Sequence, residues 1–213
     1  NFFIIYPNLK NAFSFNLIGA QMSDDIKSKW DKRYQNISGT ITAAEVLSEN
    51  LHLLPDSGDA LDLACGRGGN ALLLAKQGLR SHAWDISDVA LQTVAKEAKN
   101  QKLDVCIHQK NVEQNLPAEN SFDVIVVSYF LDRRICANLI KALRPQGVIF
   151  YQTFCKEKLS DKGPGHAEFL LERNELLSLF SDLKILYYRE DNRCGNLHEG
   201  LRDTAQFIGQ KEP

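Results

Sequence analysis

The sequence predicts an α/β fold in which helices cover both faces of a mostly parallel sheet. Apolar runs of strand length alternate with helical patterns along the chain, and the first run, at 60–64, leads through a glycine-rich turn into a helix. A later run, at 122–127, gives the strongest strand signal, because it consists almost entirely of β-branched or aromatic residues. Alternation of this kind is typical of βαβ units and of a parallel sheet.

Length and composition favour one globular domain. The chain has 213 residues, of which 44% are hydrophobic and 24% charged, with a net charge of −2. This charge balance favours no nucleic-acid or membrane partner. No run of residues approaches the roughly 18 apolar residues of a transmembrane helix. We therefore expect a cytoplasmic monomer or weak homodimer.

Five cysteines are scattered through the chain without a Cys-x-x-Cys pair. Their odd number and wide spacing favour reduced thiols in a cytosolic protein over a disulfide framework or a zinc site. The histidines show no ligand spacing either. The sequence therefore predicts no metal site.

The first 21 residues differ from the rest, because they contain no acid and a single lysine. Met22 is the one methionine, and the polar segment that follows it looks like the natural start of a bacterial protein. We expect 1–21 to be a non-native or disordered extension. The single domain then covers 22–213, with N-terminal helices or a lid at 22–55 and the sheet core at 59–213.

The remaining elements are expected in the following order. A helix begins at Ser23, and a second helix begins at the capping box Thr42-x-x-Glu45. Strand 60–64, helix 71–76 ending at Gly78, strand 80–84, a helix capped by Ser87 and strand 103–107 follow. After strand 122–127 come a helix around 136–143, the segment 144–147, strand 148–154, a polar loop at 155–168, a helix around 174–180, and two strands at 183–189 and 201–208.

The glycine-rich turn predicts a small-molecule site. Gly66, Gly68 and Gly69 permit close approach of the backbone, and the following helix directs unpaired N–H groups at the ligand. The pattern Gly66-x-Gly68-x-x-Ala71 also satisfies the dinucleotide fingerprint. The turn alone therefore leaves a nicotinamide cofactor open.

Acidic residues distinguish the two interpretations. Asp62, Asp85 and Glu113 end or follow three successive strands, so we expect their carboxylates to converge on one ligand. Such a ring repels a diphosphate, whereas the amino group, ribose diol and sulfonium of S-adenosylmethionine are better served by acids. The acids favour a methyl donor.

The pattern acid-x-x-x-Gly-x-Gly, followed about 20 residues later by a second acid, resembles the class I S-adenosylmethionine-dependent methyltransferases. The segments Trp30-Asp31-Lys32-Arg33-Tyr34, 61–70 and 169–176 are similar to small bacterial methyltransferases of the tellurite-resistance (TehB-like) type. This resemblance implies a Rossmann-like, seven-stranded, mostly parallel sheet with a C-terminal antiparallel hairpin. It also implies S-adenosylmethionine as cofactor.

We expect Asp62 to face the ammonium of the donor and Asp85 to accept the ribose hydroxyls. The resemblance implies that Arg33 neutralises the donor carboxylate, that Tyr34 covers it, and that adenine is met near Asn111 or Glu113. The predicted cofactor-binding residues are Arg33, Asp62, Ala64, Gly66, Gly68, Asn70, Asp85, Ile86, Asn111, Val112, Glu113 and Ser128.

Methyl transfer from a sulfonium needs alignment more than acid–base chemistry, and positioning alone supplies on the order of 7–11 kcal/mol. We therefore expect no catalytic dyad. Candidate acceptor contacts are Tyr129, Arg133 and His166. The predicted function is methyl transfer to a small molecule, either a tellurite- or selenite-type oxyanion or a thiol. The alternatives are an NAD(P)-binding oxidoreductase and a non-catalytic S-adenosylmethionine-binding protein.

Overall fold

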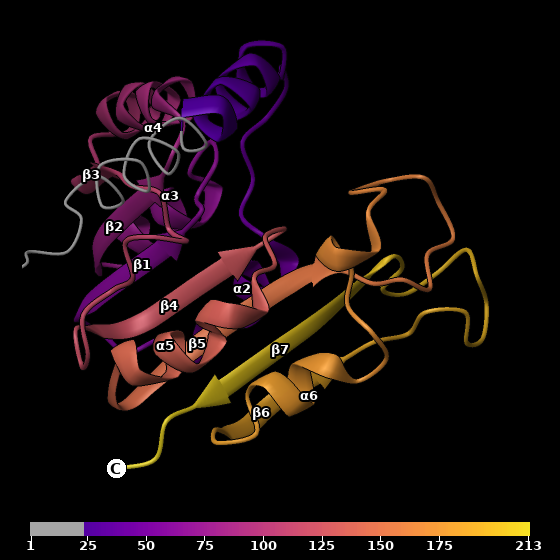
Figure 1. Cartoon of the computed structure of the whole chain (residues 1–213). Helices are drawn as coiled ribbons and strands as arrows, with labels where there is room; N and C mark the ends of the chain where they lie inside the picture. Colours follow the sequence, from indigo (N-terminus) through magenta and orange to yellow (C-terminus); the bar gives the residue numbers. More distant parts are fainter. Residues whose placement is uncertain (1–23) are drawn as a thin grey trace, which may run out of the picture.

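A seven-stranded sheet forms the centre of the molecule (Figure 1). The computed structural model describes residues 24–213, so the extension expected at 1–21 lies outside the described residues. The strand order is β3-β2-β1-β4-β5-β7-β6. The strands are β1 Asp59–Leu63, β2 Arg80–Asp85, β3 Val105–Gln109, β4 Phe122–Ser128, β5 Leu143–Phe154, β6 Lys184–Arg189 and β7 Thr204–Gln210.

Strands β1 to β5 run parallel, whereas β7 pairs antiparallel with both β5 and β6. This arrangement confirms the predicted mostly parallel sheet with its C-terminal antiparallel hairpin. The helices are residues 24–35, α2 Glu45–Ser48, α3 Gly69–Lys76, α4 Asp88–Gln101, α5 Cys136–Ala142 and α6 Glu175–Leu179, with 3₁₀ turns η1 Leu51–Leu53, η2 Arg133–Ile135 and η3 Ala167–Phe169.

The two faces of the sheet are covered by different helices. Along β4, Ile125 and Val127 join the apolar cluster under α5 and α6, and Val124 and Val126 join the opposite cluster with α2. This alternation follows from the period of two in a strand. Figure 1 shows α5 and α6 together on one face, while the helix at residues 24–35 lies beside α4 at the other end of the molecule.

The neighbours β1 and β4 mark the point at which the strand order reverses. Ligands of doubly wound sheets bind in the crevice outside the carboxyl ends of the strands at this switch point. The glycine turn after β1 and the segment after β4 therefore meet where a ligand site is expected.

The expected capping box at Thr42 is wrong. Helix α2 begins at Glu45 with Ala44 as its N-cap, and it ends at Ser48. Residues distant in the sequence supply the acceptors instead, because Asn70 Oδ1 accepts from Ala44 N at 2.8 Å and Gln152 Oε1 accepts from Val46 N at 2.9 Å. Tertiary hydrogen bonds replace the local cap.

The strand expected from Val148 begins earlier, because β5 starts at Leu143 and includes the segment 144–147. Leu143 pairs with Phe122, and Gln146 N–H donates to Lys211 O while Lys211 N–H donates to Gly147 O. The backbone of this segment therefore has partners on both sides.

The expected caps at Ser87 and Gly78 are confirmed: Ser87 Oγ accepts from Ala90 N at 3.2 Å, and Gly78 has a φ of 89° just beyond α3.

Between residues 24 and 213, no helix combines the length and the apolar character that crossing a membrane requires.

Candidate functional site

The turn after β1 has the backbone geometry that glycine permits. Gly66 and Gly68 have φ values of 52° and 79°, and Ala64 has the uncommon value of 54° for a residue with a side chain. Gly69 is required for a different reason, because a Cβ there would lie 2.0 Å from Thr42 O. The backbone before α2 therefore packs directly on the turn.

Asp62 is fully buried in β1 on the face covered by α3. Its carboxylate accepts from Ala71 N at 3.0 Å and from Asn70 Nδ2 at 3.1 Å. Burial raises the pKa of Asp62 to about 7, although the two hydrogen bonds oppose this shift. The acid therefore fixes the first turn of α3 to β1, and its expected contact with the donor's ammonium stays a prediction.

Asn70 connects three elements at the switch point. Its Nδ2 also donates to Ser128 Oγ at 2.9 Å, and its Oδ1 accepts from Ala44 N. The side chain, 3% exposed, joins the ends of β1 and β4 to the start of α2. Two predicted cofactor residues, Asn70 and Ser128, are thus brought together.

Asp85 ends β2 beside the glycine turn. Its Oδ2 accepts from Gly66 N at 2.8 Å and its Oδ1 from Ser87 N at 2.9 Å, while burial raises the pKa of the carboxyl group. The charge of Asp85 in turn raises the pKa of Asp62, so these two acids lie close together. Glu113 is exposed and accepts from Arg134 NH2 at 2.9 Å, so the structure supports convergence of two acids rather than three.

The helix at residues 24–35 is attached to α4. Asp31 Oδ1 accepts from Ser87 Oγ at 2.6 Å, and Lys27 pairs with both Asp31 and Asp88. Tyr34 lies over the glycine turn, since a Cβ on Gly66 would be 2.8 Å from the Tyr34 hydroxyl. Burial raises the pKa of Tyr34.

The Arg33 side chain packs against Trp30 in this structure. It is exposed, and its guanidinium lies 5.4 Å from the centre of the Trp30 ring. Its expected contact with the donor carboxylate stays a prediction. Ile86 is half-buried, Val112 belongs to the core, and Asn111 Oδ1 accepts from Glu113 N at 3.1 Å.

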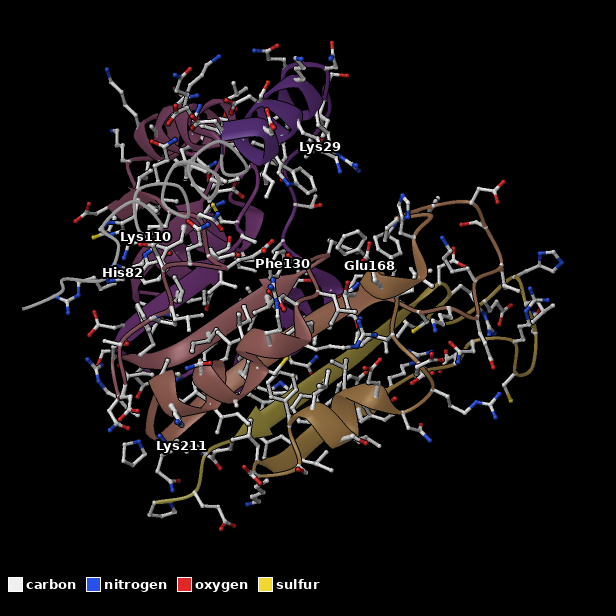
Figure 2. All side chains as sticks on the ribbon, viewed as in Figure 1. Lys29, His82, Lys110, Phe130, Glu168 and Lys211 are labelled. Atoms are coloured by element: carbon white, nitrogen blue, oxygen red, sulfur yellow. The ribbon has the colours of Figure 1, made fainter. Side chains whose placement is uncertain are left out.

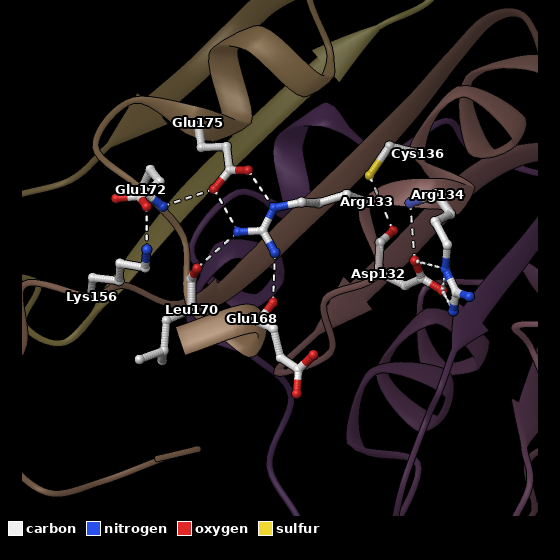
Figure 3. A network of polar contacts seen from close by, with 9 residues as sticks. All are labelled: Asp132, Arg133, Arg134, Cys136, Lys156, Glu168, Leu170, Glu172 and Glu175. Carbon is white, nitrogen blue, oxygen red and sulfur yellow. Dashed lines mark hydrogen bonds and ion pairs between the residues drawn. The ribbon is translucent and has the colours of Figure 1, made fainter. Parts of the chain in front are cut away.

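The expected role of Arg133 as an acceptor contact is not supported. Its guanidinium holds both carboxylate oxygens of Glu175, at 2.5 and 2.9 Å, and the carbonyl oxygens of Glu168 and Leu170 (Figure 3). Arg134 is likewise bonded to Asp132 and Glu113. Arg133 therefore joins the segment after β4 to the segment before α6, and Arg134 joins the same segment to Glu113 after β3.

Aromatic side chains lie at the carboxyl ends of β4 and β5, where the acceptor is expected and which we call the acceptor end of the sheet. Tyr129 follows β4 with a φ of 56° and 51% exposure, and its ring lies 5.2 Å from that of Phe154. His166 is exposed and meets the edge of Phe169 at 6.4 Å. Figure 2 shows Phe130 and Glu168 at this same end of the sheet.

A family model described as "Methyltransferase domain" matches residues 60–147, which run from β1 to the first part of β5. Within these residues lie the glycine turn, Asp62 and Asp85.

The fold of the chain is shared with solved structures. TehB from Haemophilus influenzae is 22% identical with a TM-score of 0.65, over 87% of this chain and 67% of that one. A structure from work on the conversion of a disulfide bond into a thioacetal group in echinomycin biosynthesis is 19% identical with a TM-score of 0.65, over 88% and 92%. A putative S-adenosylmethionine-dependent methyltransferase from Listeria monocytogenes is 16% identical with a TM-score of 0.61, over 81% and 100%. No curated protein sequence matches the chain.

The residues of the matched segment fit S-adenosylmethionine. The Asp85 carboxylate accepts from the backbone N–H groups of Gly66 and Ser87, and Ile86 N–H also contributes, but its two oxygens offer about four lone pairs, so the group retains capacity for a ribose hydroxyl. Its burial beside the turn also makes the site unfavourable for a diphosphate. The chemistry of the side chains agrees with a cationic donor rather than with NADH.

Two features of the candidate site were missed by sequence reasoning. Asp31 lies within the Trp30–Tyr34 segment that carried the resemblance, but its contact with Ser87 leaves no local signal. Gln152 is a buried amide in an otherwise apolar and aromatic stretch of β5, which is a signal that the sequence does contain.

Proposed function

We propose that this protein transfers the methyl group of S-adenosylmethionine to a small-molecule acceptor with a soft nucleophile, either a thiol or a tellurite- or selenite-type oxyanion. The observation that carries the proposal is the position of Asp85. Its buried carboxylate closes β2 beside Gly66 of the glycine turn, within the matched methyltransferase domain.

The donor brings an electrophilic methyl group, and the chain provides its orientation. Asp85 accepts the ribose hydroxyls, while Asp62 acts on the ammonium end through its charge or through the helix start that it holds. Tyr34 covers the turn and excludes water from it. A thiolate or an oxyanion is already deprotonated, so alignment by these groups suffices and no general base is required.

Three observations support this acceptor class. The segment after β4 reads Ser128-Tyr129-Phe130-Leu131, which differs from the Asn/Asp-Pro-Pro-Tyr signature of the adenine and glutamine N-methyltransferases that it would otherwise resemble. One similar structure is TehB, and another comes from work on a sulfur-centred reaction. Nothing in the site favours the nicotinamide alternative.

The proposal is tested by calorimetric titration with S-adenosylmethionine, S-adenosylhomocysteine and NADH. We expect micromolar binding of the first two ligands, lost in Asp85→Ala. The matched control is Asp104→Ala, which removes an exposed acid ahead of β3 and should bind as the wild type does. Binding of NADH alone would overturn the proposal.

Turnover separates an enzyme from a protein that only binds the cofactor. Wild-type protein is incubated with S-adenosylmethionine and each of selenite, tellurite and thiophenol, and S-adenosylhomocysteine and methylated products are quantified. Tight donor binding without product from any acceptor would support the non-catalytic alternative.

A further inference from the structure

A buried glutamine lies under the acceptor end of the sheet. Gln152, near the carboxyl end of β5, is 1% exposed. Its Oε1 accepts from Val46 N at 2.9 Å. A backbone N–H donates only, so this contact settles which end of the amide is oxygen and which is nitrogen.

The amide nitrogen of Gln152 therefore faces Tyr129. Nε2 donates to the Tyr129 hydroxyl oxygen at 3.1 Å, and Tyr129 N–H donates to Gln152 O at 2.8 Å. One residue thus holds both the backbone and the side chain of Tyr129, whose φ of 56° is uncommon for a residue with a side chain.

Further hydrogen bonds connect Gln152 to side chains on the side away from Tyr129, and their donors also point toward Gln152. Gln206 Nε2 donates to Gln152 Oε1 at 3.2 Å, and the Tyr187 hydroxyl donates to Gln206 Oε1 at 3.2 Å. Each donor in this chain, from β6 through β7 to β5, points toward Gln152. Gln152 Oε1 therefore accepts from two donors, Val46 N and Gln206 Nε2, and both fix the same orientation of the Gln152 amide.

The Tyr129 hydroxyl accepts from Gln152, so its own proton remains to be donated. Within residues 24–213, no acceptor for this proton is found. Burial, together with the charge of the exposed Glu45, raises the pKa of Tyr129, and the phenol keeps its proton at neutral pH. The half-exposed ring beside Phe154 therefore presents an O–H donor at the acceptor end.

We propose that Gln152 is a positioning residue that makes the Tyr129 hydroxyl a hydrogen-bond donor toward the acceptor, so that this end of the sheet selects molecules with a lone-pair atom, such as a thiolate or an oxyanion, over alkylammonium ions. The inference rests on the proposed function and restricts the class of molecules that serve as its methyl acceptor. Arg133 is bonded to Glu175 and Arg134 to Asp132 and Glu113, whereas the proton of the Tyr129 phenol has no acceptor among the described residues and is available to an acceptor molecule. An alkylammonium ion carries donors only and has no lone pair for the phenol.

The test compares Tyr129→Phe, Gln152→Glu and the double variant. Steady-state kinetics are measured with thiophenol and selenite as anionic probes and with benzylamine as the ammonium probe. Tyr129→Phe should raise KM for the turned-over anion by about tenfold or more, as expected for a lost hydrogen bond to a charged group, with a smaller change in kcat. Benzylamine should give no product.

Gln152→Glu conserves size and reverses the polarity. The introduced carboxylate still accepts from Val46 N and Gln206, but it draws the Tyr129 proton inward. We expect a loss similar to that of Tyr129→Phe, and the double variant should lose no more than Tyr129→Phe alone, because Gln152 acts through the hydroxyl. Calorimetric affinity for S-adenosylmethionine should stay unchanged throughout.

Tyr187→Phe is the matched control, because it removes the far end of the hydrogen-bond chain and keeps every contact of Gln152. Its KM should equal that of the wild type. Additive losses in the double variant, equal losses in Tyr187→Phe, or an unchanged KM in Tyr129→Phe would each overturn the proposal. If the protein binds S-adenosylmethionine but methylates benzylamine, the proposal is also overturned. The same holds if it binds S-adenosylmethionine and methylates none of the probes. Absence of donor binding would instead refute the proposed function.

Discussion

Asp31 Oδ1 accepts a hydrogen bond of 2.6 Å from Ser87 Oγ, and the same hydroxyl accepts from Ala90 N. One side chain therefore caps α4 and attaches the helix at residues 24–35, which carries Tyr34. Because Tyr34 lies over Gly66, the position of the Tyr34 ring over the glycine turn depends on the contact between Asp31 and Ser87.

Asp31→Ala should weaken binding of S-adenosylmethionine roughly three- to tenfold, the equivalent of an ordinary hydrogen bond. The physical reason is that the helix at residues 24–35 loses its attachment to α4 and covers the turn for less of the time. Calorimetry measures the effect. Lys29→Ala, on the exposed side of the same helix (Figure 2), is the control and should bind normally, and equal losses in both variants would contradict the prediction.

Asn70→Ala should lower the free energy of unfolding by about 2–4 kcal/mol. Ala44 N–H loses its acceptor in a buried position, and Asp62 loses one of its two donors. Urea unfolding should show a lower midpoint with an unchanged slope. Lys76→Ala, exposed at the other end of α3, should unfold as the wild type does.

Asp62 should make stability depend on pH between about 4 and 7. Its pKa is raised from 3.8 to about 7 in the folded protein, so the folded state binds the proton more tightly than the unfolded chain does. The stabilisation is complete below pH 4 and is lost as the pH rises through 7, by up to about 4 kcal/mol at 1.36 kcal/mol per pH unit. Denaturant unfolding of wild type and Asp62→Asn from pH 4 to 8 measures the difference, and parallel pH profiles would refute it.

Gly69→Ala should destabilise the protein by about 1–3 kcal/mol and weaken donor binding, because the new methyl group would displace the backbone at Thr42. Thermal unfolding and calorimetry check both effects. Gly165→Ala is the matched control: a Cβ there meets nothing within 4 Å, so it should change neither measurement.

Much of the fold could be predicted because its signals are local. The apolar run of β1, the glycine turn and the strand β4 can be recognised from neighbouring residues, and the family resemblance supplied the order of the C-terminal hairpin. The capping of α2 could not be predicted in this way. Its acceptors, Asn70 and Gln152, lie 26 and 106 residues from the amides that they bind.

The site was predicted to a similar extent. Asp62, Asn70, Asp85 and Ser128 were named because they lie at strand ends or in the turn, and the structure brings them together. The contacts of Arg133 within the fold could not be predicted, for a physical reason. A run of charges next to the site resembles an anion contact, and its partner Glu175 lies 42 residues further along the chain.

The position of β7 has a consequence for synthesis of the protein. Within residues 24–213, the strand at 204–210 comes last in sequence, yet it lies inside the sheet, between β5 and β6. While the ribosome still holds these residues, β5 has an open edge and β6 has no neighbour with which to pair. The parallel half that carries Asp62 and Asp85 is therefore made first and protected last, so the nascent chain passes through a stage in which the cofactor end is complete but an inner strand edge is exposed to aggregation.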